Sequence, residues 1–242
     1  MNSVKKLQIF GERCSGTNYL EQLINKNIPS ISITTEYGFK HFFPKTDVGK
    51  SNDCLFIILY RNPFDWLKSI YRNPWHANAE LKALSFSDFI RSKWICVWDK
   101  DAGVSKKDKR YNTEIMFERC PVSEKRFENL IKMRTAKILA WETIRDKNSN
   151  TVYIRYEELI LDPEKHIRII SYKLDLPMTP IFKGVDSYKG LRWYQGLKTR
   201  ILRKPLPIVN SDDLQYIVMH LDEQLENSVS YNIKSLLAEQ SG

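Results

Sequence analysis

The sequence has few cysteines and no long apolar run. Its four cysteines lie far apart and form no Cys-x-x-Cys pair, a spacing that favours neither a zinc site nor a disulfide framework. The longest apolar run, Cys54 to Tyr60, is far shorter than the ~18 residues of a transmembrane helix. Residues 1–10 lack the apolar region and cleavage site of a signal peptide. We therefore expect no membrane span, no metal and a reducing, cytoplasmic setting.

Positive charge is what the sequence has in excess. Lys and Arg number 38 against 29 Asp and Glu, which gives a net charge of +9. The 42% of hydrophobic and 28% of charged residues are typical of a globular protein and exclude wholesale disorder. A chain of 242 residues predicts one or two domains with a sizeable core. The net charge indicates an anionic partner: nucleic acid, a membrane surface, a phosphorylated cofactor or an acidic acceptor.

Strand and helix patterns alternate along the chain. Residues 7–10 predict a short strand, and apolar residues at 20, 23 and 24 predict a helix after it. The apolar run 55–60 predicts a strand buried on both faces, followed by a helix that Asn62 caps and Pro63 begins. A third strand is expected at 151–155, before a helix opened by Asp162 and Pro163. This alternation indicates a three-layer α/β fold with a mainly parallel sheet.

The stretch 74–147 separates the second and third of these units. It contains helix candidates at 86–98 and 124–145, joined by a polar loop at 99–119. Because no Pro/Gly/Ser-rich linker marks a boundary, we interpret the stretch as a helical insertion in a single domain, 1–242. A last helix is expected from Ser211, with inward residues Leu214, Ile217, Val218, Leu221 and Leu225.

The turn at residues 11–17 has the composition of a phosphate-binding loop. Backbone N–H groups at a helix N-terminus point at the ligand above it, and Gly16 lets the backbone come close. Arg13 adds charge. An ordinary capped turn explains an isolated Ser-Gly-Thr equally well. No lysine follows Gly16, which argues against the Walker A loop of ATP and GTP hydrolysis. Side-chain donors are available from Ser15, Thr17 and Asn18.

Arg61 ends the second predicted strand, at the sheet edge where open α/β folds bind ligands. Its guanidinium can bind two phosphate oxygens at once, and Ser69, about two turns into the next helix, offers a neutral donor. A structural alternative pairs Arg61 with Asp65 and gives Ser69 no ligand. The spacing alone leaves both interpretations open.

Three segments, taken together, resemble motifs of the sulfotransferases that use 3′-phosphoadenosine 5′-phosphosulfate (PAPS). Residues 11–17 resemble the family's 5′-phosphosulfate loop, 59–69 its 3′-phosphate motif, and 155–163 its Tyr-Glu-x-Leu-x-x-Asp-Pro stretch. The motifs occur in the family's order, each between a strand and a helix. The resemblance implies a sulfotransferase-like fold with P-loop-like units. It also implies transfer of a sulfuryl group from PAPS, without a metal, to a hydroxyl or amine of a small molecule or carbohydrate.

The resemblance also assigns residues to the donor. The first loop would hold the 5′-phosphosulfate, Arg61 and Ser69 the 3′-phosphate, and Tyr156 would lie beside the adenine. The family's loop lysine is replaced by Cys14, and a basic-glycine segment near the C-terminus is matched loosely at residues 189–193. The implied donor-binding set is Arg13, Cys14, Ser15, Gly16, Thr17, Asn18, Tyr19, Arg61, Ser69, Tyr156, Lys189 and Gly190.

Lys40 and His41 lie where many family members have a Lys/His pair. A histidine accepts a proton near neutral pH, and a lysine stabilises charge on the leaving phosphate oxygen. The family separates the two by one residue, whereas here they are adjacent and would point to opposite faces of a regular strand. We therefore expect His41 to be the general base, with Lys40 second. Glu12 and Glu36 are alternatives, because some branches use a glutamate.

Two other functions compete with this interpretation. A degenerate P-loop nucleotide kinase is disfavoured by the missing Gly-Lys and by the lack of a strand-ending aspartate for magnesium. A polyanion-binding protein would use the basic stretch 180–204, but few aromatic residues accompany it. We expect no nucleic acid partner. The unassigned basic residues 106–110 leave an acidic acceptor open, and the sequence does not set the oligomeric state.

Overall fold

The computed structural model describes residues 4–45, 48, 51–185 and 205–240. The chain divides into two compact units, each made of two separate stretches. Unit 1 comprises 1–62 and 140–203, and unit 2 comprises 63–139 and 204–242. The expectation of a single domain over 1–242 stays a prediction.

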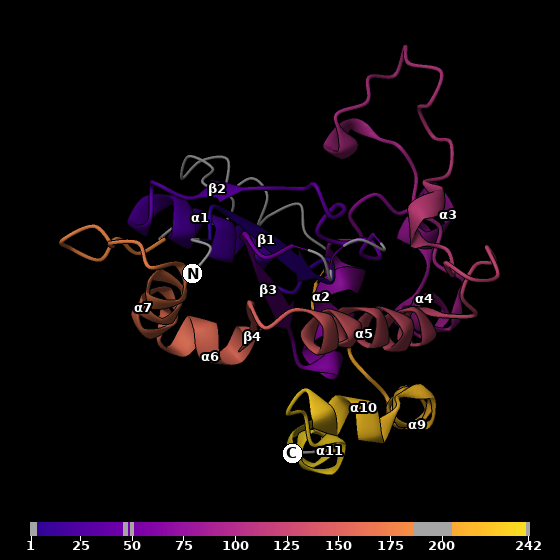
Figure 1. Ribbon diagram of the computed structural model, residues 1–242. Coiled ribbons are helices and arrows are strands. Elements are labelled where there is room, and N and C mark those ends of the chain that lie inside the picture. The colour runs from indigo at the N-terminus through magenta and orange to yellow at the C-terminus, as the bar shows by residue number, and fades with distance from the viewer. Residues whose placement is uncertain (1–3, 46–47, 49–50, 186–204, 241–242) are drawn as a thin grey trace. The chain divides into compact units, whose positions relative to one another are not determined.

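Unit 1 is built on a parallel sheet with the strand order β2-β1-β3-β4, which can be followed in Figure 1. The strands are β1 (Lys6–Gly11), β2 (Ser32–Ile33), β3 (Cys54–Tyr60) and β4 (Thr151–Arg155). Every residue of β3 is buried, as its apolar run predicted. The three strands expected from the sequence are confirmed, whereas the two-residue β2 was not foreseen.

Helices pack against both faces of this sheet, which confirms the predicted α/β class. On one face, the core joins apolar residues of β1, β3 and β4 to α1 (Thr17–Asn27) and α7 (Pro163–Leu174). On the other face, Tyr60 packs against Trp141 of α5 (Leu130–Lys147), with ring centroids 6.3 Å apart. The Tyr60 hydroxyl donates to Glu142 of the same helix at 2.9 Å.

The strand–helix junctions follow from local chemistry. The Asp162 carboxylate accepts from the Lys165 N–H at 3.0 Å and Pro163 begins α7, as the Asp-Pro pair predicted. In α1 the N-cap is Gly16, with φ +97°. The short helix α6 (Tyr156–Leu161) lies between β4 and α7, so Tyr156 follows directly on the carboxyl end of β4.

In unit 2 the prediction of a helix at 86–98 is wrong for its second half. Helix α4 (Phe86–Arg91) ends there because Ser92 is extended, with φ −84° and ψ 152°. The following segment makes isolated antiparallel bridges through Cys96 to Ala77 and through Val97 to Glu114. The residues expected to extend the helix are therefore held by bridge partners distant in the chain.

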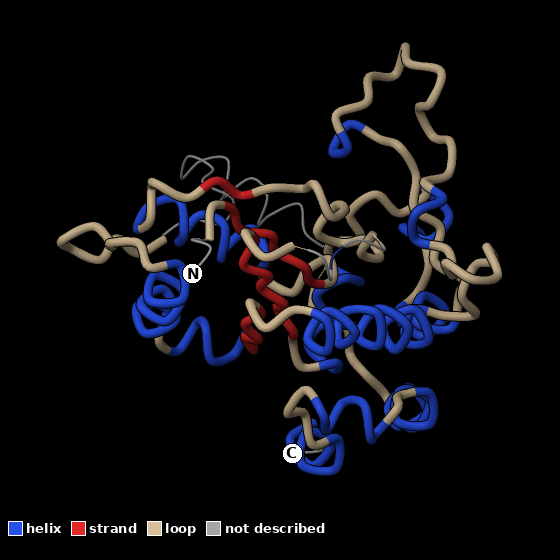
Figure 2. Tube along the Cα trace, in the orientation of Figure 1, coloured by secondary structure: helices blue, strands red, loops and turns tan. Residues whose placement is uncertain are grey.

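The helix predicted from residue 124 begins six residues later, as α5. The side chain of Asn129 accepts from the Lys132 N–H at 2.9 Å and so acts as its N-cap. Residues 124–129 are not helical, and most of the segment 99–129 is loop (Figure 2). This loop contains two short 3₁₀ turns, η2 (Lys100–Ala102) and η3 (Met116–Glu118).

The remaining helices of unit 2 are α2 (Pro63–Arg72), α3 (Ala79–Ala83), α9 (Ser211–His220), α10 (Glu223–Ser228) and α11 (Ile233–Gln240). The single last helix expected from Ser211 is wrong. Asn210, not Ser211, caps α9 by accepting from the Asp213 N–H at 2.8 Å. The extended Leu221 ends α9, which places Leu225 in α10.

Buried ion pairs join distant stretches of unit 2. Arg134 of α5 donates to both carboxylate oxygens of Glu226 in α10, at 2.6 and 2.8 Å. One turn further, Lys137 donates to Glu118 at 2.5 Å, and the Trp94 indole N–H donates to the same carboxylate at 2.8 Å. Each of these buried charges is neutralised by an opposite charge, which burial requires.

Candidate functional site

The loop between β1 and α1 lies at the carboxyl edge of the sheet and has a geometry suited to an anion. Gly16 has a left-handed backbone conformation and no side chain to accept from the first N–H groups of α1. Those groups carry the partial positive charge of the helix dipole, and no acidic residue lies in the first turn. Cys14 is also left-handed, with φ +65°. The loop therefore offers backbone donors and positive potential, as the sequence predicted.

Ser15 closes this loop from inside. It is fully buried, and its hydroxyl and backbone N–H both donate to the Glu12 carbonyl, at 2.7 and 3.1 Å. Gly11 leaves no room for a side chain, because a Cβ there would lie 2.7 Å from the Leu59 carbonyl oxygen. The Ser15 hydroxyl thus holds the shape of the loop, and its role in donor binding stays a prediction.

Arg13 brings a buried positive charge into the loop. Its side chain is almost inaccessible, and its guanidinium lies 5.8 Å from the centre of the Phe42 ring. An arginine against an aromatic face is held by both the cation–π attraction and the shape of the contact. The role of Arg13 as the charge beside Cys14 stays a prediction.

Arg61 contacts the same loop from the neighbouring strand. It follows the last residue of β3, and its Nη1 donates to the Cys14 carbonyl at 2.8 Å. Its guanidinium carbon lies 4.6 Å from the centre of the Tyr156 ring. The Tyr156 ring also packs on the loop, because a Cβ on Gly16 would lie 2.3 Å from its Cδ2. The structure therefore brings together Cys14, Gly16, Arg61 and Tyr156 from three separate predicted motifs.

Lys40 and His41 lie in a turn rather than in a strand, so strand alternation does not apply to them. The Lys40 ammonium donates to Asn18 at 2.6 Å and to the Glu21 carboxylate at 2.7 Å. The Lys40 carbonyl accepts from the Gly11 N–H at 2.9 Å. Lys40 is thus held against the first two turns of α1 as a charged donor.

His41 is bonded to the backbone of the loop. Its Nδ1 lies 2.7 Å from the Gly11 carbonyl oxygen, and the side chain is mostly buried. Because a carbonyl oxygen only accepts, Nδ1 carries the hydrogen, and the neutral ring has its lone pair on Nε2. The Phe39 ring packs edge-on against the imidazole, with centroids 5.3 Å apart. This geometry defines the nitrogen that can take a proton.

The other predicted residues lie in different parts of the chain, and some lie outside the described residues. Thr17 is buried at the start of α1, and Tyr19 is half-buried against the core. Ser69 lies in α2 of unit 2. Lys189 and Gly190, with most of the basic stretch 180–204, lie outside the described residues.

Two acidic side chains of unit 1 were not foreseen from the sequence. Glu21 pairs with Lys40, and Glu157 accepts from the Asn62 N–H at 2.9 Å, which ties the end of β3 to the start of α6. The only signal for Glu157 was its place beside Tyr156 in the third motif. In unit 2, His76 bonds to Asp99 at 2.8 Å, a contact between positions 23 residues apart that no local pattern indicates.

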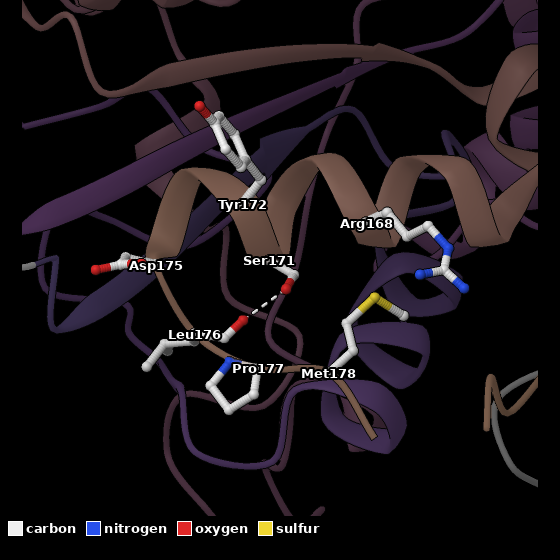
Figure 3. Close-up of a pocket in the computed structure, with 7 residues that line it drawn as sticks. All are labelled: Arg168, Ser171, Tyr172, Asp175, Leu176, Pro177 and Met178. Carbon is white, nitrogen blue, oxygen red and sulfur yellow. Dashed lines mark hydrogen bonds between the residues drawn. The ribbon is translucent and has the colours of Figure 1, made fainter. Parts of the chain in front are cut away.

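An open pocket of about 510 Å³ lies beside α7 (Figure 3). Its lining comes from α7 and from residues 175–178 that follow it. The Ser171 hydroxyl donates to the Leu176 carbonyl at 2.5 Å, and Tyr172 points away from Pro177 (Figure 3). Since its polar groups do not converge on one point, this pocket is a surface hollow rather than a second polar site.

The cysteines and acids give no sign of a second kind of site. All four cysteines lie in the described part of the chain, and none forms a disulfide. Burial raises the pKa of the Cys54 thiol to about 12, which keeps it protonated at neutral pH. Within residues 4–45, 48, 51–185 and 205–240, no group of His, Cys, Asp and Glu could hold a metal ion. Across the same residues, no helix has the length and apolar character to span a bilayer.

A helix N-terminus and a strand-ending arginine lie at one edge of a parallel sheet, an arrangement in an α/β protein that suits an anion. The family model for the sulfotransferase domain matches residues 40–189, more than half of the chain. The chain therefore belongs to the sulfotransferase family, whose members are transferases. The matched range includes Lys40, His41, Arg61 and Tyr156, and it begins after the first loop. No curated protein matches the chain.

Proposed function

We propose that this sulfotransferase moves the sulfuryl group of PAPS to a hydroxyl or amine of a small-molecule or carbohydrate acceptor. The observation that carries the proposal is the hydrogen bond from Arg61 to the Cys14 carbonyl. It joins two segments that are each suited to a phosphate. PAPS has phosphate groups at both its 5′ and 3′ positions, so a donor of this kind needs two such segments.

The first loop suits the 5′-phosphosulfate. It combines the start of α1, the bare backbone at Gly16 and the positive charge of Arg13, with Asn18 beside it. Because the matched family range begins at Lys40, this assignment is supported by the loop's geometry and by its resemblance to the family motif. Thr17 belongs to the same proposed subsite, whereas Tyr19 is proposed to lie near the adenine.

Arg61 would bind the 3′-phosphate, since an arginine presents paired N–H donors to phosphate oxygens. Ser69 is its proposed neutral companion, and Tyr156 would contact the adenine. The proposed closure of this subsite by Lys189 and Gly190 stays a prediction.

His41 is the proposed general base. The acceptor's oxygen or nitrogen forms a bond to sulfur as its proton passes to Nε2 of His41, and the bond between sulfur and the 5′-phosphate oxygen breaks. The products are the sulfated acceptor and 3′,5′-adenosine bisphosphate. Lys40 and Arg13 would offset the negative charge that grows on the leaving oxygen, so fixed positive charge and positioning carry the step.

The acceptor side is proposed to lie in the insertion, 74–147. Four exposed basic residues there give it a positive surface, consistent with an acidic acceptor: Lys106, Lys107, Lys109 and Arg110. Asp108 is bonded to Arg110 at 3.1 and 2.8 Å, so it neutralises only part of this charge. We propose a reducing, cytoplasmic setting and no nucleic acid partner.

Thermal unfolding with different nucleotides tests the donor assignment. At 100 times its Kd, a ligand stabilises the folded state by about 2.7 kcal/mol, which raises Tm by roughly 5–10 °C in a protein of this size. We expect this shift with 3′,5′-adenosine bisphosphate and a much smaller one with 5′-AMP. Arg61→Ala should weaken bisphosphate binding by about 10- to 100-fold, the loss expected for hydrogen bonds to a charged group.

Arg168→Ala is the matched control, because Arg168 is an exposed arginine of unit 1 that lies on α7. It should leave the bisphosphate shift unchanged. Equal shifts with the bisphosphate and 5′-AMP would contradict the 3′-phosphate assignment. A shift with ATP and magnesium alone would favour the kinase alternative, and one with single-stranded DNA alone the polyanion-binding alternative.

A further inference from the structure

Tyr156 contacts both predicted phosphate-binding segments at once. It is the first residue of α6, and its ring lies against the backbone of Gly16 and under the guanidinium of Arg61. The ring edge is so close to Gly16 that a Cβ there would lie 2.3 Å from Cδ2 and 2.6 Å from Cε2. A ring in this contact has little room to turn, so its face is a fixed platform.

Arg61 is held in two directions by these neighbours. The ring face below it, 4.6 Å from the guanidinium carbon, restrains the tilt of the guanidinium plane. The hydrogen bond from Nη1 to the Cys14 carbonyl, 2.8 Å long, restrains its rotation within that plane. These two contacts together set the orientation of the guanidinium.

We propose that Tyr156 is a positioning residue that holds Arg61 ready for the 3′-phosphate, and so determines the preference for 3′-phosphorylated nucleotides. The inference rests on the proposed function and adds a role distinct from contact with adenine. Binding a phosphate through a long, flexible side chain costs conformational entropy. A guanidinium already fixed by Tyr156 and the loop carbonyl loses less entropy when it binds.

The aromatic face carries this role, and the hydroxyl does not enter it. Both contacts, to Gly16 and to Arg61, are made by the ring. Tyr156→Phe should therefore preserve the preference for the bisphosphate. Tyr156→Leu removes the flat face and the π system, and Arg61→Lys removes the planar partner while keeping the charge.

Calorimetric titration with 3′,5′-adenosine bisphosphate and with 5′-AMP separates the two roles. A cation–π contact that is partly desolvated corresponds to roughly a 5- to 30-fold effect on binding. Tyr156→Leu should lower the ratio of bisphosphate to 5′-AMP affinity by this factor, and Tyr156→Phe should leave it unchanged. Tyr172→Leu, which removes an exposed tyrosine of the same unit, is the matched control.

A Tyr156→Leu variant that weakens both nucleotides by the same factor would overturn the proposal, since that is the result of adenine contact alone. If Tyr156→Leu does not fold, Tyr156→Met decides instead: an unchanged ratio of bisphosphate to 5′-AMP affinity would contradict the role of the ring face, and a lowered ratio would support it. In the Arg61→Ala background, Tyr156→Leu should change the ratio no further. Failure of the proposed function looks different, because the wild-type protein would then show no preference for the bisphosphate.

Discussion

The hydrogen bond from His41 to the Gly11 carbonyl couples the proposed base to the proposed donor loop. Gly11 also donates its N–H to the Lys40 carbonyl, so the turn and the end of β1 are joined by two bonds. A shift of the loop would therefore move the proposed base and the proposed donor-binding loop together. This is the kind of fixed geometry that general base catalysis needs.

Replacing His41 with asparagine separates the chemistry from the structure. An asparagine amide can still donate to the Gly11 carbonyl but cannot accept a proton, so His41→Asn should lower kcat by about 10²- to 10⁴-fold. Affinity for 3′,5′-adenosine bisphosphate should not change. Steady-state sulfate transfer measures kcat, and calorimetric titration measures the affinity for the bisphosphate.

His166→Asn is the control, because His166 lies on α7 and is no part of the proposed site. Turnover near that of the wild type in His41→Asn would move the base role to Glu12 or Glu36. Glu12→Gln and Glu36→Gln would then identify which carboxylate acts.

At the scale of elements, the long loop of unit 2 is held together by one carboxylate and two arginines. Glu114 accepts from Arg126 at 3.0 and 2.7 Å and from Arg119 at 3.1 and 2.6 Å. The hydrogen bonds from Arg126 and Arg119 lower the pKa of Glu114 to about 2. These paired bonds explain how a loop with little helix keeps a defined conformation.

The loop's contribution to stability should depend on pH. Because the folded pKa of Glu114 is lower than its unfolded value near 4.5, the stabilisation is complete above the unfolded value and is lost as pH falls toward 2. Glu114→Gln should cost on the order of 1 kcal/mol at pH 7, allowing for solvent screening. The difference should shrink below about pH 4.5. Urea unfolding at several pH values measures the difference in free energy of unfolding between the wild type and Glu114→Gln. The exposed Glu128→Gln is the control. A difference that does not change with pH would refute this account.

Elements that a run of apolar residues or a capping residue specifies locally could be predicted from the sequence. Elements that depend on contacts with distant segments could not. The apolar run of β3 and the Asp162-Pro163 pair specify a strand and a helix start without tertiary information. The end of α4 depends instead on bridges to Ala77 and Glu114, which lie on either side of it in the chain. The two-residue β2 is too short to carry a pattern.

The same distinction applies to the candidate site. The motifs predicted that Arg61 and Tyr156 would lie near the first loop, because neighbouring parallel strands end at one edge of the sheet. The bonds of Arg61 to a backbone carbonyl and of His41 to Gly11 depend on the path of the loop and of the turn at 35–45, which residue types alone do not specify.

At the scale of the whole molecule, unit 2 depends on ion pairs between segments far apart in the chain. Arg134 and Glu226 are both almost fully buried, and the Arg134 guanidinium also lies 5.3 Å from the centre of the Trp66 ring. The pair thus connects helix α5 to helix α10 and contacts α2. Removing one partner would leave the other charge buried without compensation.

Glu226→Gln should therefore lower the free energy of unfolding by about 3–5 kcal/mol. The double variant Arg134→Met with Glu226→Leu should lose less stability than Glu226→Gln, because it leaves no buried charge without a partner. Glu223→Gln, which removes the exposed pair with Lys234, should cost at most about 1 kcal/mol. Urea unfolding followed by circular dichroism measures the free energy of unfolding of each variant. Equal losses of stability for the buried and the exposed pair would contradict a special role for the buried pair.

The strand order also determines when the sheet can be completed during synthesis. Strand β3 pairs with β1 on one side and with β4 on the other, and Phe56 lies opposite Thr151, which the ribosome adds 95 residues later. Until β4 emerges, the apolar β3 is an open edge strand, and such edges pair readily with other chains. All of residues 61–150 are therefore synthesised while this edge of β3 is unpaired, which makes the pairing of β4 the step that protects the chain from aggregation.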